Sequence, residues 1–401
     1  MIKKINTDKI KVGMYIHDLN CGWMGHSFLK NSFAVRNDKT IRKIYDNGIR
    51  EVYIDTQKGD DIQEGQTEEE VNASLDQRML EIAAQDRKTD DRVSLAEEIP
   101  RAHRLHTEAN RIVRNLMADV RLGKLIELER VEPMVENVAD SIFRNPNALL
   151  PMTMLKNHDN YTFEHSVSVC ALMVVFSREM NLPRDIIVRI AVGALLHDLG
   201  KAQITDKILN KPGKLTEEEF ISIKEHVVHG VRLLADIQGI TSMELEVTGQ
   251  HHERFDGSGY PHRLIGEDIS LYGHMAAIVD VYDAISSDRV YHKGLPPTIA
   301  LKKILEWSDH HFDPILAQKF IRSVGIYPSG TLVRLHSGRL GVVIQQKEKT
   351  LLEPLVRVFY NSRQKHYIQP EIIDLSKTHD HVVSCEDYKK WNINPKQWLP
   401  L

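Results

Sequence analysis

The stretch IAVGALLHDLGK, residues 190–201, decides the fold. An apolar run fills residues 190–196 and predicts a buried helix, and His197 and Asp198 follow it side by side. A buried carboxylate without a partner is costly, so a cation must compensate Asp198. Lys201, three residues further on, could be that cation. Two adjacent polar side chains in an apolar setting nevertheless fit the edge of a metal site better.

More histidines and one aspartate interrupt apolar helical patterns elsewhere: His165 in FEHSVSV, His226 in KEHVVHG, His251 and His252 at the start of HHERFDGSGYP, and Asp280 in AAIVDVYDA. Taken singly, each could be a histidine satisfied by a core hydrogen bond or a carboxylate that caps a helix. Together, they would require several independent polar intrusions into one helical core. Convergence on metal cations accounts for them with one cause, and imidazole with carboxylate suits Fe, Mn or Zn.

Read in order, these residues resemble the HD-GYP group of the HD-domain phosphohydrolases. The match consists of HDLGK at 197–201, His226, HHExxxGxGYP at 251–261 and DxxDAxxxxR at 280–289, within about residues 155–325. The resemblance implies a mainly α protein with an all-helical HD-type phosphohydrolase core. It also implies a phosphodiesterase that hydrolyses 3′,5′-linked cyclic dinucleotides, cyclic di-GMP and/or 3′,3′-cyclic GMP-AMP, to the linear dinucleotide.

The resemblance further implies two divalent metal ions, Fe or Mn, with Zn, Ni or Mg as alternatives. One ion would be held by His165, His197, Asp198 and Asp280, and the second by His226, His251, His252 and the bridging Asp198. A metal-bridged hydroxide would attack phosphorus. Lys201 would contact that hydroxide and a phosphate oxygen, or else serve only as a charge partner of Asp198. Tyr161 stands where some members place a glutamate that supports a third metal, so we expect two.

The loop FDGSGYP, residues 255–261, resembles the edge of the family's substrate groove. Gly257 and Gly259 would let its backbone approach a ligand, unless the loop is only a tight turn. Tyr260 would stack on a base or bond a phosphate. Arg289 and Lys293 resemble a cationic clamp on the substrate phosphates, because a guanidinium fits a phosphate through paired hydrogen bonds. Either residue could equally be a solvated surface charge.

The rest of the chain predicts flanking modules. Residues 1–58 predict a small α+β N-terminal module, with a helix over 38–47 whose apolar face holds Ile41, Ile44 and Tyr45. Residues 59–100 predict an acidic, mobile linker, because residues 60–98 contain 13 Asp or Glu and 4 Lys or Arg. Residues 101–325 would be the helical HD-GYP phosphodiesterase domain, and residues 326–401 a small β-rich C-terminal domain with a turn at 336–338.

The composition of the chain excludes some classes of binding partner. A net charge of -4 excludes a general basic field for a nucleic-acid polymer. No apolar run is long enough to span a membrane, and 3 cysteines far apart fit the reducing cytoplasm. Beyond the cyclic dinucleotide, other signalling proteins or a second copy of the chain are open partners. The helices at 101–145 could form a dimer interface or simply pack on the HD core. A catalytically weak HD-GYP module that only binds nucleotide or proteins is the alternative function, although every expected ligand position is filled.

Overall fold

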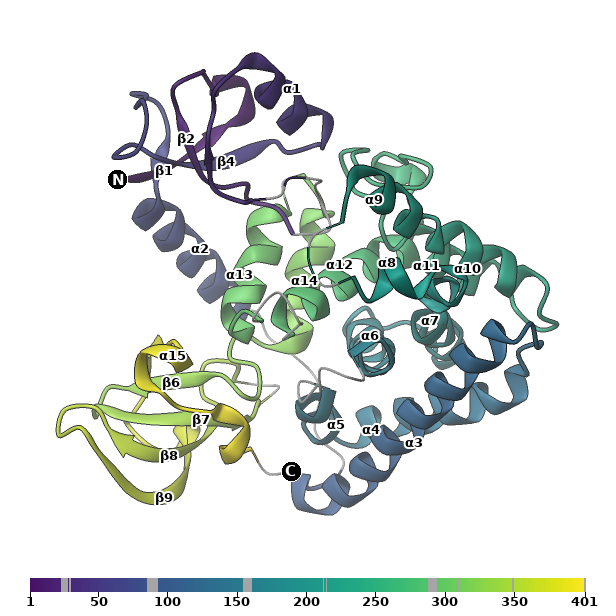
Figure 1. Cartoon of the computed structure of the whole chain (residues 1–401). Helices are drawn as coiled ribbons and strands as arrows, with labels where there is room; N and C mark the ends of the chain where they lie inside the picture. Colours follow the sequence, from purple (N-terminus) through teal and green to yellow (C-terminus); the bar gives the residue numbers. More distant parts are fainter. Residues whose placement is uncertain are drawn as a thin grey trace.

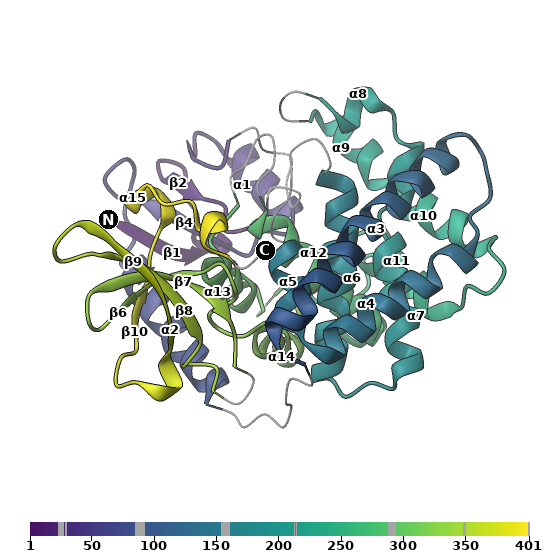
Figure 2. The same cartoon turned by 90° about the horizontal axis from the view of Figure 1, so that it is seen from below.

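A helical core carries two small antiparallel sheets on one side in the computed structural model of the protein (Figures 1 and 2). The structure describes residues 1–22, 28, 30–84, 93–153, 161–211, 213, 215–287, 294–308, 310–347 and 350–399. Within these residues, no helix is both long and apolar enough to cross a bilayer. The prediction of a mainly α protein with two small flanking β modules is confirmed.

The core helices run from the acidic segment to the C-terminal sheet. They are α3 (Leu95–Arg121), α4 (Glu132–Arg144), α5 (Pro146–Thr153), α6 (Tyr161–Glu179), α7 (Arg184–Leu196), α8 (Asp206–Leu209), α9 (Glu217–Lys224), α10 (His226–Ala235), α11 (Ser242–Gln250), α12 (Leu271–Ser286), α13 (Pro297–Trp307) and α14 (Pro314–Val324).

Helix α6 lies at the centre because it is apolar on opposite faces. Leu172 and Phe176 belong to a buried cluster with α12, α13 and α14, whereas Ala171 and Val175 belong to another with α3, α4 and α7. A helix that is apolar all round is buried all round. The polar residues that this part of the chain carries therefore lie in the interior rather than at the surface.

The N-terminal module is a five-stranded sheet in the order β3-β2-β4-β1-β5, with every neighbour antiparallel. Its elements are β1 (Ile2–Asn6), β2 (Tyr15–Asp18), β3 (Phe33–Ala34), α1 (Asp38–Asp46), β4 (Glu51–Asp55) and β5 (Gln66–Thr67). The predicted helix is present as α1, and Ile44 is buried. Tyr45, predicted on the same apolar face, is instead 45% exposed and faces the helical core's cleft described below.

The segment predicted as an acidic linker contains a helix, α2 (Glu68–Ala83). Its first residue follows a capping box in which Thr67 and Glu70 satisfy each other's backbone N–H groups. Val71, Leu75, Met79 and Ile82 form one buried stripe that packs into the cluster of α12, α13 and α14. The described part of the segment is therefore anchored on the core, and its acidic residues occupy the outer face of the helix.

The C-terminal module is a second five-stranded antiparallel sheet, in the order β10-β6-β7-β8-β9. Its elements are β6 (Leu332–Leu335), β7 (Arg339–Gln345), β8 (Leu355–Asn361), β9 (His366–Asp374), β10 (Val382–Cys385) and the short helix α15 (Tyr388–Trp391). The predicted turn at 336–338 joins β6 to β7, and Gly338 adopts a positive φ of 85° there. The sheet contacts the core through Asn147, whose side chain bonds to the backbone of Gln346.

Candidate metal centre

The predicted metal ligands converge from five helices in the middle of the core. Helix α6 supplies His165, the end of α7 supplies His197 and Asp198, the start of α10 supplies His226, the end of α11 supplies His251 and His252, and α12 supplies Asp280. The side chains of the seven residues are 10% exposed or less. Most of these residues lie at the ends of helices, where the backbone changes direction, and this allows several side chains to point toward one common centre.

Three of the imidazoles have a fixed tautomer. In each, Nδ1 donates to the backbone carbonyl three residues earlier: His197 to Ala194 at 2.7 Å, His226 to Ile223 at 2.6 Å, and His251 to Thr248 at 2.7 Å. A carbonyl oxygen only accepts, so Nδ1 carries the proton and Nε2 presents a lone pair. This is the form in which histidine binds a metal, with its second nitrogen held by an outer partner.

His165 faces three carboxylates. Its Nδ1 lies 2.6 Å from Asp283 Oδ2, and its Nε2 lies 3.0 Å from Asp280 Oδ1 and 3.6 Å from Asp198 Oδ2. Burial opposes protonation, but the bonds to Asp280 and Asp283 outweigh it and raise the pKa of His165. The Nε2 lone pair and two carboxylates repel one another unless a proton or a metal cation lies among them.

Several buried polar atoms at the centre make no hydrogen bond. Within the described residues these include Nε2 of His197, Nε2 of His252 and Oδ1 of Asp198. Unsatisfied buried atoms are rare and costly in proteins. Each of the three atoms can offer a lone pair, so a bound cation would satisfy them together. The residues present therefore fit a metal ion.

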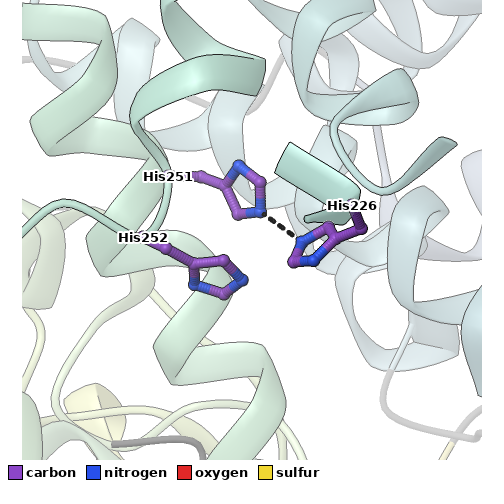
Figure 3. A group of neighbouring side chains, drawn as sticks. All are labelled: His226, His251 and His252. Atoms are coloured by element: carbon purple, nitrogen blue, oxygen red, sulfur yellow. Dashed lines mark hydrogen bonds between the residues drawn. The ribbon is translucent and has the colours of Figure 1, made fainter. Parts of the chain in front are cut away.

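The donor atoms fall into neighbouring groups. His226, His251 and His252 form one, shown in Figure 3, where His226 Nε2 and His251 Nε2 lie 3.3 Å apart. His165, His197 and Asp280 form another, and within each group the donor atoms lie within 4.8 Å of one another. Asp198 belongs to a third group with His197 and His251, and so joins the first two. Its Oδ1 lies 3.4 Å from His226 Nε2 and its Oδ2 3.5 Å from His197 Nε2.

The electrostatics keep the ligands in their metal-binding charge states. Burial is the main cause that lowers the pKa of His226 to about 4 and the pKa of His251 to about 3. Burial would raise the pKa of Asp198, but Lys201 and the surrounding imidazoles hold it well below its usual value. Lys201 Nζ donates to Asp198 Oδ2 at 2.5 Å. At neutral pH the centre thus offers neutral imidazoles at His226 and His251 and an ionised carboxylate at Asp198, whereas the raised pKa of His165 favours its protonated form until a metal cation replaces the proton.

The GYP loop lies directly against the predicted metal ligands. The buried Glu253 accepts hydrogen bonds from the backbone N–H groups of His262 and Leu264, which fixes the loop. Tyr260 stacks on His252 with a centroid separation of 4.7 Å. Gly259 has no room for a Cβ, which would lie 2.4 Å from the backbone nitrogen of Arg254. Gly257 needs its glycine for another reason, a φ of +76°.

A cleft of about 330 Å³ opens over the centre. His251, His252 and Asp280 line its floor, and the GYP loop, including Gly257, Gly259 and Tyr260, lines one wall. The predicted clamp residues Arg289 and Lys293 lie outside the described residues, as does the side chain of Tyr161. Of the thirteen predicted site residues, the structure therefore brings eleven together: Lys201, Gly257, Gly259, Tyr260 and the seven ligands.

Sequence reasoning missed the role of Asp283. In the sequence this residue is only one letter of the DxxDA motif, yet its carboxylate bonds to His165 Nδ1 and sets the proton position on that ring. A spacing of three residues from Asp280 puts both carboxylates on one face of α12, and both are buried. A second aspartate at that spacing from a candidate ligand is the signal that could have indicated the role.

Comparisons with known proteins agree with the geometry. Residues 150–316 match the model of the HD domain, and residues 2–131 match a domain of unknown function, DUF3391. A cyclic di-GMP phosphodiesterase of Pseudomonas aeruginosa is 39% identical over 406 residues, which cover 100% of this chain and 96% of that protein. A cyclic di-GMP phosphodiesterase of Thermotoga maritima is 33% identical over 55% of this chain and 60% of its own length. A 3′3′-cGAMP-specific phosphodiesterase of Vibrio cholerae is 39% identical over 31% of this chain and 24% of its own.

A helical core that gathers buried histidines and aspartates around one centre defines the class of HD-domain proteins, whose members of this kind are metal-dependent. Two observations point to one group within this class: the GYP loop lies against that centre, and a relative matches along the whole chain. The chain belongs to the HD-GYP family of HD-domain phosphohydrolases.

Proposed function

We propose that the protein is a phosphodiesterase that hydrolyses cyclic dinucleotides, cyclic di-GMP and/or 3′,3′-cyclic GMP-AMP, to the linear dinucleotide. The observation that carries the proposal is the set of seven buried ligand side chains at the floor of a cleft walled by the GYP loop. The relatives described above support it, since they are named as phosphodiesterases of these two substrates. A catalytically weak binding module would be favoured by a lost ligand, and none of the seven positions is lost.

The ligand assignment is part of the proposal. One ion would be held by His165, His197, Asp198 and Asp280, and the other by Asp198, His226, His251 and His252. Two divalent ions there, Fe or Mn, with Zn, Ni or Mg as alternatives, would supply Lewis acidity and lower the pKa of a water that attacks phosphorus. Asp198 is suited to the shared position because its two oxygens face different groups of imidazoles.

The residues around the centre would orient the substrate and stabilise charge. Lys201 places an ammonium beside Asp198, where it would also stabilise the negative charge that develops on phosphorus oxygens. Tyr260, held by stacking on His252, would contact the nucleotide. Arg289 and Lys293 remain the proposed clamp on the substrate phosphates. Without a third carboxylate ligand at position 161, we expect two ions and a product cut once.

The proposal has a direct test. Purified protein would be analysed for metals and incubated with cyclic di-GMP and with 3′,3′-cyclic GMP-AMP in the presence of Fe(II) or Mn(II). We expect about two metal ions per chain and a linear dinucleotide as the main product by chromatography. No turnover of either substrate under these conditions would refute the function. Such a substrate would place the enzyme in the cytoplasm, in keeping with three unpaired cysteines.

The assignment of four parts, 1–58, 59–100, 101–325 and 326–401, also remains a proposal, with the helix α2 as the part of the second that packs on the core. A homodimer through the helices at 101–145 and further signalling partners likewise stay predictions. Size-exclusion chromatography with light scattering would decide the oligomeric state.

A further inference from the structure

The N-terminal module forms part of the wall of the catalytic cleft. The cleft's lining includes Tyr45, Asp46, Asn47, Gly48 and Arg50, which follow one another from the end of α1 to the start of β4. They lie opposite the ligands His251, His252 and Asp280 in the same cavity. A molecule that fills the cleft would therefore contact both modules.

The module is held in this place by close contacts. Gly48 touches the GYP loop, and a Cβ at this position would lie only 2.3 Å from the Cβ of Ser258. Its φ of +70° also belongs to the region that favours glycine. Further back, Tyr53 donates to the buried carboxylate of Glu306 on α13 at 2.7 Å, and Trp307 donates to Asn20 at 3.2 Å. The N-terminal module therefore contacts both the GYP loop and α13.

The cleft carries cations that have no carboxylate partner. Lys224, Arg254 and Arg263 line it, and none of them makes an ion pair with any described residue. The ammonium of Lys224 lies over the ring of Tyr260, 4.8 Å from its centroid. The same cleft is also lined by four carboxylates, of which Glu253 binds backbone N–H groups and Asp280 belongs to the predicted metal centre; the others are Asp46 and Asp256. Because none of these carboxylates pairs with Lys224, Arg254 or Arg263, an anion in the cavity would relieve the repulsion among the three cations. These three residues all come from the catalytic domain.

Arg50 adds a fourth cation from the other module. Its only side-chain bond in the described structure runs from Nε to Asp256 Oδ2, and at 3.4 Å it is long for a charge-assisted bond. The Nη groups stay free to bind, and the side chain is 44% exposed. A guanidinium with two free Nη groups matches the oxygens of a phosphate.

We propose that Arg50, with Lys224, Arg254 and Arg263, binds the phosphate group of the cyclic dinucleotide that is not cut. This inference rests on the proposed function. A cyclic dinucleotide carries two phosphodiester groups on opposite sides of one ring, and the metal centre engages only one of them. The second negative charge enters the same cleft and needs a cationic partner away from the metals. The N-terminal module thereby contributes to substrate affinity.

The test compares a substrate that has a second phosphate with one that lacks it. Cyclic di-GMP, or 3′,3′-cyclic GMP-AMP if that is the better substrate, has two, whereas bis(p-nitrophenyl) phosphate has one. We expect Arg50→Ala to raise KM for the cyclic dinucleotide about tenfold or more, with kcat nearly unchanged, which is the size of effect of losing one charge-assisted bond. KM for bis(p-nitrophenyl) phosphate should stay within about twofold, and Arg50→Lys should recover part of the affinity.

A matched control is available in the same module. Lys43, on α1, forms an ion pair with Glu217 on α9, so it also links the two modules, but it does not line the cleft. Lys43→Ala should leave both KM values unchanged. An unchanged KM in Arg50→Ala, an equal rise for both substrates, or an equal rise in Lys43→Ala would each overturn the inference. Failure of the wild-type protein to cleave either cyclic dinucleotide would instead overturn the proposed function.

Discussion

Asp198 is the single residue on which the centre depends most. Its oxygens lie between imidazoles of different helices, and one of them makes no bond in the described structure. Its position beside His197 was predictable, because a carboxylate at the end of a buried apolar run is costly unless a cation compensates it. The hydrogen bond between His165 and Asp283 was harder to predict. It joins two helices, and its only trace in the sequence is the three-residue spacing between Asp280 and Asp283.

Replacement of Asp198 should abolish metal binding at both positions. We expect Asp198→Ala to retain far-UV circular dichroism near wild type but to lose both metals, because a bridging carboxylate serves the two ions at once. Elemental analysis of the purified variant measures this. About two metals per chain in Asp198→Ala would show that the bridging assignment is wrong.

Lys201 should act on the rate rather than on metal content. Its side chain is 18% exposed and its ammonium bonds to Asp198, so its removal takes a positive charge from the proposed reaction site without removing a predicted ligand. We expect Lys201→Ala to lower kcat roughly a hundredfold or more, as other lost electrostatic stabilisers do. Steady-state kinetics with parallel metal analysis measures both quantities. A wild-type kcat at saturating substrate would leave Lys201 as a structural partner of Asp198 alone.

Helix α2 is the element on which sequence and structure disagree. The segment was predicted to be a linker because of its thirteen acidic residues between 60 and 98. It also contains apolar residues at 71, 75, 79 and 82, whose spacing is that of one helix face. Composition describes the average of a segment, whereas burial needs only one face to be apolar. The core helices were predictable for the opposite reason, since α6, α7 and α12 are apolar on most sides.

The stripe on α2 should contribute to global stability. Leu75 is 6% exposed and packs in the core cluster, so we expect Leu75→Ala to lower the free energy of unfolding by about 2–5 kcal/mol. Leu80 on the same helix is 49% exposed, and Leu80→Ala should change the free energy of unfolding by no more than about 0.5 kcal/mol. Urea denaturation of both variants makes the comparison. Equal, small effects would mean that α2 is detached in solution.

The whole molecule combines a helical core with two flanking modules, and residues of the core and of the N-terminal module line the cleft. Each module was predictable from local patterns of the chain, because helices and strands carry their own periodicity. The approach of residues 45–50 to the GYP loop was not, because it depends on contacts between residues some 200 positions apart, such as Arg50 with Asp256. Tyr45 shows the difference, because its side chain lines the cleft whereas Ile44 of the same predicted face is buried in the module's core.

The stability of the metal-free protein should fall as the pH is lowered from 7 to 5. Burial keeps the pKa of His226 at about 4 and that of His251 at about 3 in the fold, while both have ordinary values near 6.5 when unfolded. Below pH 6.5 these two histidines are therefore protonated in the unfolded chain but not in the folded one. The free energy of unfolding should fall by on the order of a few kcal/mol by pH 5. His165, whose pKa is raised, opposes this trend only near its ordinary value of 6.5, because well below that value it is protonated in both states.

Thermal unfolding of chelator-treated protein at several pH values measures this dependence. The variant His251→Gln, which removes one of the two groups, should show a shallower fall than wild type over the same range. A Tm that stays constant between pH 7 and pH 5 would contradict the burial of neutral imidazoles at this centre.

The hydrogen bonds from Nδ1 of His197, His226 and His251 to the main chain also bear on how the enzyme can evolve. The accepting carbonyls belong to residues 194, 223 and 248, and they persist whichever amino acid those codons specify. A side-chain substitution that leaves the helix backbone in place therefore does not remove these proton acceptors. His165 differs, because its acceptor is the side chain of Asp283. Among the residues that hydrogen-bond to the predicted ligands, position 283 is therefore where we expect substitutions to accumulate, in natural variants or in a laboratory screen for altered metal preference.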